Sequence, residues 1–437
     1  MPEHKFEWYL DFVDTSYQPS DDELIVVYKA KPAPGVTLEE VAGRLASESS
    51  VGTWTTLATM KPHVRRLMAK AYEVRHEDGI VKIAYPIDLF ELGSLPQLFS
   101  SVLGNVYGMR AVKRLKAIDI RFPEKYVKSF PGPNYGQHGV RKILGVEKRP
   151  ILATVPKPKV GLRVDEYAEV AYEIAVGGMD LVKDDENHTS MSFNKFDERL
   201  NAVLKALEKA EAETGEKKGY LANVTAPAEE MKRRIKLVAD TWNKFIMVDV
   251  LCAGPAAVQM ARDLAEEYGL AIHAHRAFHA AIDRVPDHGV TFFLLAKLFR
   301  LAGVDHIHIG TNVGKMEADL KMLRYTEDMI TKDHFKPEPG DTVYMEQKWY
   351  GLKPVMPVAS GGLHPGVLPQ LLDFMGLDIL IQVGGGVTGH PDGVIAGGRA
   401  VRQAIEAYLQ GIPLDEYAKT HRELARALEK WGYVRPM

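Results

Sequence analysis

The sequence predicts an α/β protein in which a C-terminal (β/α)₈ barrel follows a smaller N-terminal α+β domain. From about residue 150 onward, short apolar runs alternate with amphipathic helical stretches, which is typical of a parallel sheet built from βα units. The carboxyl ends of these runs collect Lys, Asp, Glu, His and Gly, and active sites of such barrels lie at that edge. The first 130 residues or so lack this alternation.

The N-terminal domain, residues 1–132, is expected to be ferredoxin-like, with an antiparallel sheet. Apolar runs rich in β-branched residues predict its strands, and apolar residues at helical spacing predict its helices. The strands are expected at 23–32 and 79–88, and the helices at 37–49 and 94–105. A Pro- and Gly-rich segment, 129–139, marks the boundary.

The barrel domain, residues 133–437, is expected to contain eight strands, each followed by a helix. One such helix is predicted over 196–215, where Leu and Ala recur at helical spacing before a Gly stop. A final amphipathic helix over 415–432 is expected to pack on the barrel. The strands are predicted at 151–157, 179–185, 220–226, 245–251, 270–276, 304–310, 355–362 and 378–386.

Composition excludes several classes of protein. The length of 437 residues suits two domains. The net charge of −3 argues against nucleic acid as a partner, because the chain has no excess of basic residues. We expect neither a leader peptide nor a membrane span, because no apolar run approaches the roughly 20 residues that a span needs. The single cysteine, Cys252, is predicted to lie in a strand and favours a reducing, cytoplasmic location.

The segment 177–190, GGMDLVKDDENHTS, is the strongest candidate site. Residues two apart in a strand share a face, so Lys183 and Asp185 point the same way and Glu186 lies at the following turn. Carboxylate oxygens at the end of a buried strand suit Mg²⁺, which keeps positions free for a substrate. For this segment alone, a solvated charge cluster in a loop remains an alternative.

Glycine-rich turns follow strands seven and eight, at 358–364 and 382–390. Phosphates commonly bind there in such barrels, because glycines let consecutive N–H groups converge on an anion. Simple tight turns are the alternative for each segment by itself.

Histidines recur two residues apart in strands five and six, at 273–275 and 306–308. We interpret Arg276 and His308 as a second anion site and His275 as an acid/base group, although a core histidine is often merely hydrogen-bonded. Two anion sites with a metal between them imply a bisphosphate substrate.

The loop 310–320 after strand six carries Lys315 between glycine-bounded turns. Loops of this kind close over substrates and bring in a late catalytic charge. A lysine at the start of a helix is an equally good interpretation of this segment alone.

Together these motifs resemble the large subunit of ribulose-1,5-bisphosphate carboxylase/oxygenase (Rubisco), and the similarity covers nearly the whole chain. Further motifs carry it: SESSVGTWTT (47–56), GNVYG (104–108), KPK (157–159), HAHRAFHAAIDR (273–284), DHIHIGTNVGKMEA (305–318), PVASGG (357–362) and QVGGGVTGHP (382–391).

The resemblance implies that Lys183 is carbamylated by an activating CO₂ and binds Mg²⁺ with Asp185 and Glu186. Lys157 and His275 would be acid/base groups, and Lys315 would stabilise the carboxyl group formed from substrate CO₂. The remaining implied substrate-binding residues are Lys159, Arg276, His308, Ser360, Gly361, Gly362, Gln382, Gly384 and Gly385, with Thr53 and Trp54, and with Glu48 and Asn105 from a partner subunit.

The family also implies ribulose 1,5-bisphosphate, CO₂ and O₂ as reactants and a homodimer or a higher homo-oligomer. Val155 stands where many carboxylases have threonine, and Met316 where plants have leucine. With the absence of plant-like extensions, this favours the archaeal form III enzymes, which lack small subunits and use ribulose bisphosphate made from nucleotides. A Rubisco-like enolase or isomerase of sulfur salvage, or a non-catalytic phosphosugar-binding protein, are the alternatives.

Overall fold

The computed structural model describes residues 7–313 and 319–432. The chain forms two compact units. Unit 1 comprises Met1–Pro131, Phe278–Ala302 and Lys332–Leu352, and unit 2 comprises Gly132–Ala277, Gly303–Thr331 and Lys353–Met437.

Unit 1 is built on a five-stranded sheet with the order β10-β4-β1-β3-β2. The pairs β1/β3, β1/β4 and β2/β3 are antiparallel, as predicted, and β10 pairs with β4 in parallel. Its strands are β1 (Glu23–Pro32), β2 (Lys70–Arg75), β3 (Ile80–Pro86), β4 (Val112–Arg121) and β10 (Gly289–Val290), and β12 (His334–Phe335) and β13 (Gln347–Lys348) form a separate pair.

The predicted helices of this unit are α1 (Leu38–Glu48) and α3 (Leu95–Val102). Thr37 begins α1 with a capping box to Glu40, a device that stabilises a helix by about 1 kcal/mol. The other helices of unit 1 are α2 (Pro62–Arg65), α4 (Glu124–Val127), α11 (His279–Asp283) and α12 (Phe292–Ala302).

Strand β4 was not predicted, because it carries charged residues that are satisfied only by distant parts of unit 1. Lys297 of α12 donates to Asp119 at 2.7 Å, and both side chains are fully buried. Lys116 donates to backbone carbonyls of residues 283, 285 and 288. Because these partners are far away in the sequence, a local sequence pattern cannot predict this strand.

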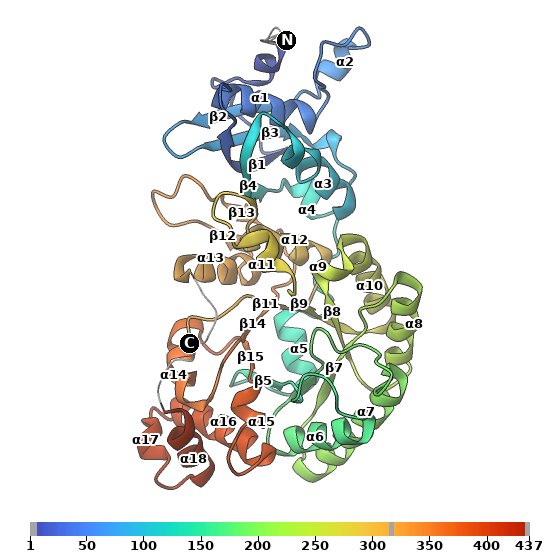
Figure 1. The fold of residues 1–437 in the computed structure, drawn as a ribbon, viewed down its shortest axis with the longest axis vertical. Helices are drawn as coiled ribbons and strands as arrows, with labels where there is room; N and C mark the ends of the chain where they lie inside the picture. The colour runs from blue at the N-terminus through green and yellow to red at the C-terminus, as the bar shows by residue number, and fades with distance from the viewer. Residues whose placement is uncertain (1–6, 314–318, 433–437) are drawn as a thin grey trace. The chain divides into compact units, whose positions relative to one another are not determined.

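Unit 2 contains the predicted closed barrel, with the strand order β11-β14-β15-β5-β6-β7-β8-β9 and parallel pairing throughout (Figure 1). All eight predicted strands are present, but each ends earlier than expected. Lys157, Asp185 and Arg276 therefore lie in the loops beyond their strands, whereas other polar residues of the site are the last residues of strands. The strands are β5 (Ile151–Thr154), β6 (Leu181–Lys183), β7 (Gly219–Asn223), β8 (Phe245–Asp249), β9 (Ala271–His275), β11 (His306–His308), β14 (Met356–Ser360) and β15 (Leu380–Gln382).

The amino end of the barrel is closed by α5 (Gly136–Leu144). Val140 and Leu144 of this helix share one apolar cluster with the first residues of several strands, including Ile151, Leu181 and Phe245. The barrel interior is therefore a packed core at its amino end, which leaves the carboxyl end for polar chemistry.

Helices between and after the strands complete unit 2. The predicted helix at 196–215 is α7 (Phe196–Thr214), which ends at Gly215 in the left-handed conformation. The others are α6 (Val164–Val176), α8 (Ala228–Ala239), α9 (Val250–Ala253), α10 (Pro255–Tyr268), α13 (Leu320–Thr331), α14 (Leu368–Met375), α15 (Gly385–Thr388), α16 (Val394–Leu409), α17 (Leu414–Tyr417) and α18 (Arg422–Trp431).

Two local predictions were wrong. The single helix expected over 415–432 is split into α17 and α18, because His421 Nδ1 lies 2.8 Å from the Tyr417 carbonyl and competes with helical hydrogen bonding. Cys252 is exposed in α9, because β8 ends at Asp249 and a single helical turn, closed by Gly254, follows. Within residues 7–313 and 319–432, no helix is long and apolar enough to cross a membrane.

Candidate active site

Side-chain alternation along the barrel strands assembles a polar layer at their carboxyl ends. On β9, Ala271 belongs to the apolar core cluster, so His273 and His275, two and four residues later, also face the interior. The same alternation on the other strands adds further inward-facing side chains to this layer: Lys183, Asn223, Asp249, His308, Ser360 and Gln382.

Lys183 is fully buried at the end of β6. Its Nζ donates to the Asp184 carbonyl oxygen at 2.7 Å. Burial lowers its pKa below 10.5, although Asp185, Asp249 and Glu186 oppose the shift by favouring the cation. A lowered pKa increases the neutral, nucleophilic fraction of the amine.

Asp184 is part of the framework rather than of the site. Its carboxylate accepts hydrogen bonds from Tyr167 at 2.7 Å and Tyr220 at 2.6 Å, and from Arg199 at 3.1 Å. Burial alone would raise its pKa, but Arg199, His188 and the hydrogen bonds hold it below the usual value. The KDDE segment is thus a built structure and not a solvated charge cluster.

Asp185 and Glu186 each bind a lysine from the loop after β5. Lys157 Nζ lies 2.5 Å from Asp185 Oδ2, and Lys159 Nζ pairs with Glu186 Oε1. Burial and the neighbouring Glu186 raise the pKa of Asp185, while hydrogen bonds from Asp185 and Lys159 lower that of Glu186 against its own burial. Without a metal, Asp185 therefore tends to hold a proton while Glu186 stays ionised. A bound cation would favour the ionised form of both carboxylates.

These oxygen donors fit Mg²⁺. In the described part of the chain, no three His, Cys, Asp or Glu side chains gather as a metal site. Asp185 and Glu186 nevertheless place two hard oxygen ligands beside the Lys183 amine, whose conversion to a carbamate would add a third.

His275 lies on the other side of Glu186, with its Nε2 3.9 Å from Glu186 Oε2. Its Nδ1 is 3.0 Å from Asp249 Oδ1 and 3.1 Å from the backbone nitrogen of Ala277, so the tautomer decides which of the two it bonds. Burial and Lys183 lower the pKa of His275. Asp249 was not singled out from the sequence, although an acid at the end of an apolar strand is the signal that could have found it.

His308 and Ser360 adjoin one another, as the predicted anion site requires. His308 Nδ1 lies 2.8 Å from Ser360 Oγ. Arg276 follows β9, and its guanidinium is close enough to Gly310 that a Cβ there would lie 3.2 Å from Nη2. Three neighbouring strands therefore present these groups at one edge.

The two glycine-rich turns lie side by side. Gly361 and Gly362 have φ values of 112° and 77°, which favour glycine. A Cβ on Gly386 would lie 2.3 Å from the Leu363 carbonyl oxygen, whereas Gly385 has no atom within 4 Å and Gly384 meets only Lys157 Cε at 3.5 Å. Gly384 and Gly385 thus border open space next to Lys157. Gln382 Oε1 is buried and accepts no hydrogen bond from any residue that the structure describes.

Four candidate residues, Glu48, Thr53, Trp54 and Asn105, belong to unit 1. Asn105 Nδ2 donates to Glu48 Oε1 at 3.3 Å, beside a hollow of about 240 Å³. Thr53 is half-buried, and Trp54 is 66% exposed. Lys315 lies outside the described residues.

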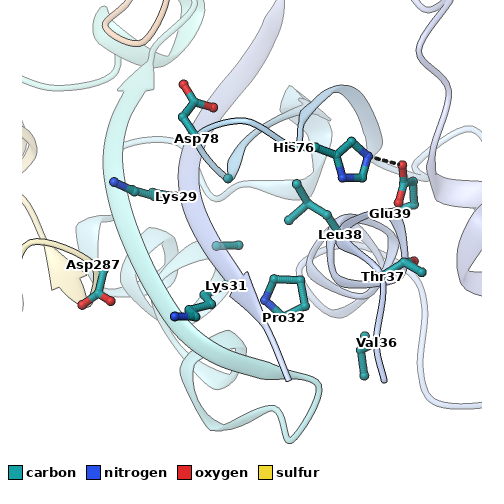
Figure 2. Close-up of a pocket in the computed structure, with 12 residues that line it drawn as sticks. Lys29, Lys31, Pro32, Val36, Thr37, Leu38, Glu39, His76, Asp78 and Asp287 are labelled. Atoms are coloured by element: carbon teal, nitrogen blue, oxygen red, sulfur yellow. Dashed lines mark hydrogen bonds and ion pairs between the residues drawn. The ribbon is translucent and has the colours of Figure 1, made fainter. Parts of the chain in front are cut away.

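Unit 1 also has a larger hollow of about 660 Å³ that contains none of the candidate residues (Figure 2). Lys29 and Lys31 of β1 line it, and His76 Nε2 lies 2.7 Å from Glu39 Oε1 at its edge. Its mixture of exposed charges of both signs defines no ligand class.

Comparisons with known proteins identify the family of the chain. A family model described as the ribulose bisphosphate carboxylase large chain, catalytic domain, matches residues 136–431, and one for the N-terminal domain of that chain matches residues 11–126. The chain is 51% identical to the ribulose bisphosphate carboxylase of Pyrococcus abyssi, over 99% of both chains. It is 49% identical to that of Archaeoglobus fulgidus, over 99% of this chain and 100% of the relative.

Solved structures of archaeal Rubisco are also similar to nearly the whole chain. The dimeric archaeal Rubisco from Hyperthermus butylicus superposes with a TM-score of 0.94 at 58% identity, covering 98% of this chain and 100% of that one. The octameric Rubisco of Pyrococcus horikoshii, in complex with sulfate, gives a TM-score of 0.92 at 50% identity over 98% of both chains. The chain belongs to the ribulose bisphosphate carboxylase large chain family.

Proposed function

We propose that this chain is a carboxy-lyase that adds CO₂ to ribulose 1,5-bisphosphate and forms two molecules of 3-phosphoglycerate, with a side reaction with O₂. The observation that carries this proposal is the buried Lys183 amine beside Asp185 and Glu186, which Lys157 and Lys159 contact. Relatives at about 50% identity are named as carboxylases, which favours carboxylation over the sulfur-salvage and binding alternatives.

Activation begins at Lys183. Its neutral amine attacks an activating CO₂, a C–N bond forms, and one proton leaves, so that a neutral amine becomes a carbamate anion. This change turns the lysine into a third oxygen ligand for Mg²⁺ beside Asp185 and Glu186. When bound there, Mg²⁺ supplies Lewis acidity that polarises the substrate ketone.

Lys157 and His275 then move protons. Burial keeps His275 neutral near pH 7, so one ring nitrogen is available as a base, and Asp249 orients the ring from Nδ1. Lys157, which pairs with Asp185, would alternate between donor and acceptor, and Lys159, which pairs with Glu186, would contact the substrate. Lys315 would stabilise the carboxyl group as it forms.

The two phosphates would bind at separate edges of the barrel. Arg276, His308 and Ser360 hold one, because they combine a guanidinium with two hydrogen-bonding groups. Glycine turns hold the other through backbone N–H groups. The residues proposed for this second end are Gly361, Gly362, Gln382, Gly384 and Gly385, with Thr53 and Trp54.

The assembly is proposed to be a homodimer or a higher homo-oligomer without small subunits, in which Glu48 and Asn105 complete the site of the partner. The related structures described as dimeric and octameric support this. We further infer a cytoplasmic enzyme that uses ribulose bisphosphate derived from nucleotides, in keeping with its archaeal relatives.

The test is incorporation of radiolabelled bicarbonate in the presence of ribulose 1,5-bisphosphate and Mg²⁺, with acid-stable 3-phosphoglycerate as the product. Lys183→Ala is the matched control and should incorporate no label. Conversion of the bisphosphate without incorporation of label would contradict the proposal and indicate an isomerase.

A further inference from the structure

A chain of three buried histidines runs from Ser360 into the barrel interior. His308 Nδ1 lies 2.8 Å from Ser360 Oγ, and His308 Nε2 lies 2.8 Å from His273 Nε2. His273 Nδ1 in turn lies 3.2 Å from His306 Nδ1. The exposed fractions of His273, His306 and His308 are 0%, 0% and 3%.

All three rings are neutral near pH 7. Burial lowers the pKa of His306 to about 3 and holds those of His273 and His308 well below 6.5. Each ring therefore carries one N–H and one lone pair. Adjacent rings are nearly perpendicular, at 84° for His273 and His308 and 81° for His273 and His306.

One proton per ring allows only two continuous arrangements. In the outward arrangement, His306 donates to His273, His273 donates to His308, and His308 donates through Nδ1 to Ser360 Oγ. In the inward arrangement every donor is reversed, and Ser360 donates to His308. Any mixture would place two lone pairs or two N–H groups against each other at 2.8 or 3.2 Å.

Two observations favour the outward arrangement. His306 Nε2 is buried and bonds no described residue, so the inward arrangement would leave an orphaned N–H there, which is the rarer kind of unsatisfied buried group. The outward arrangement also frees the Ser360 hydroxyl proton to donate to an anion. The inward arrangement would instead present oxygen lone pairs to it.

We propose that His273 and His306 are positioning residues that fix the tautomer of His308, so that Ser360 presents its hydroxyl proton to a substrate phosphate. This inference rests on the proposed function for the identity of the anion. The tautomers themselves follow from the geometry of the histidine chain. Anion binding at Ser360 and proton order at His306 are thus linked, and each stabilises the other.

Neutron diffraction of the deuterium-exchanged protein tests the tautomers directly. We expect deuterium on Nδ1 of His308 and His306 and on Nε2 of His273, with none on Nε2 of His306. Deuterium on Nε2 of His308 would overturn the inference. This measurement does not require carboxylase activity, so it can succeed even where the radiolabel assay fails.

Kinetics test the consequence. His306→Leu removes the donor at the end of the chain and should raise the KM for ribulose 1,5-bisphosphate about tenfold, with kcat changed less than about twofold. His306→Asn carries an amide nitrogen near the position of Nδ1 and should return KM to within about twofold of wild type. An equal KM for the Leu and Asn variants would contradict the proposal.

His390 supplies the control for a merely structural effect. It is also buried, but its ring nitrogens bond the backbone of residues 423 and 392. His390→Leu should lower thermal stability and leave KM unchanged. A matching rise of KM in this variant would show that loss of any buried histidine weakens substrate binding, and would overturn the specific role of His306.

Discussion

Lys157 and Asp185 form an ion pair of 2.5 Å that ties the loop after β5 to the loop after β6. The pair joins a proposed acid/base group to a proposed metal ligand. Binding of Mg²⁺ to Asp185 would release Lys157 for the substrate, so metal loading and the availability of Lys157 would be coupled.

Activation should depend on CO₂ and pH through Lys183. Because burial lowers the pKa of this lysine, its neutral fraction rises with pH over a range below the usual 10.5. The rate of activation at limiting CO₂ should therefore increase with pH and level off below that value. Trapping of the labelled carbamate measures this rate, with Lys183→Ala as the control. Full activity without prior exposure to CO₂ would count against the carbamate.

Lys315→Ala should separate the two halves of the reaction. If this lysine acts only on the forming carboxyl group, the variant should still exchange the carbon-3 proton of ribulose bisphosphate with solvent but fix almost no CO₂. Tritium exchange and label incorporation are measured on the same preparation. Equal losses of both would assign Lys315 to binding or enolisation.

Subunit sharing predicts complementation between inactive variants. Glu48→Gln and Lys183→Ala should each be nearly inactive, because each removes one part of every site. Random co-refolding makes half of the dimers mixed, and each mixed dimer has one intact site, so about a quarter of wild-type activity should return. Mass spectrometry confirms the mixed dimers. Their complete inactivity would show that each site is built within one chain.

Replacement of Asp184 should mainly lower stability, whereas replacement of Asp185 should mainly lower activity. Asp184→Ala leaves Arg199 buried without its carboxylate partner and should destabilise the protein by about 3–5 kcal/mol in chemical unfolding. Asp185→Asn should abolish carboxylation but change stability by less than about 1 kcal/mol, because burial already raises the pKa of this carboxyl and disfavours its ionised form. Similar losses of stability would mean that both acids are structural.

Adjacent glycines in the turn after β15 offer a matched pair. Gly385→Ala adds a methyl group to open space, so the fold should be kept while the KM for the bisphosphate rises about tenfold. Gly386→Ala places its Cβ against the Leu363 carbonyl oxygen and should lower the melting temperature. An unchanged KM for Gly385→Ala would remove this turn from the phosphate site.

Local patterns predicted the barrel and most of its polar edge, because buried parallel strands are continuous apolar runs and their ends carry the reactive residues. They missed β2 and β4, whose charged residues are spread through the strands, and in β4 are neutralised by partners more than 160 positions away. They also left the roles of Asp184, Asp249 and His306 undefined. Neighbours in space, and not in sequence, decide whether such side chains support the framework or the chemistry.

The closure of the barrel by α5 has a consequence for redesign. Val140 and Leu144 fill the amino end of the barrel, and the charged layer lies at the carboxyl end. The two ends are therefore built from different side chains. Substitutions that keep the volume of this apolar cluster should therefore change heat stability with little effect on substrate preference. The loops that follow the strands should be exchangeable for those of related proteins. The exchange must keep the hydrogen-bond partners of Asp184 on α6, α7 and β7.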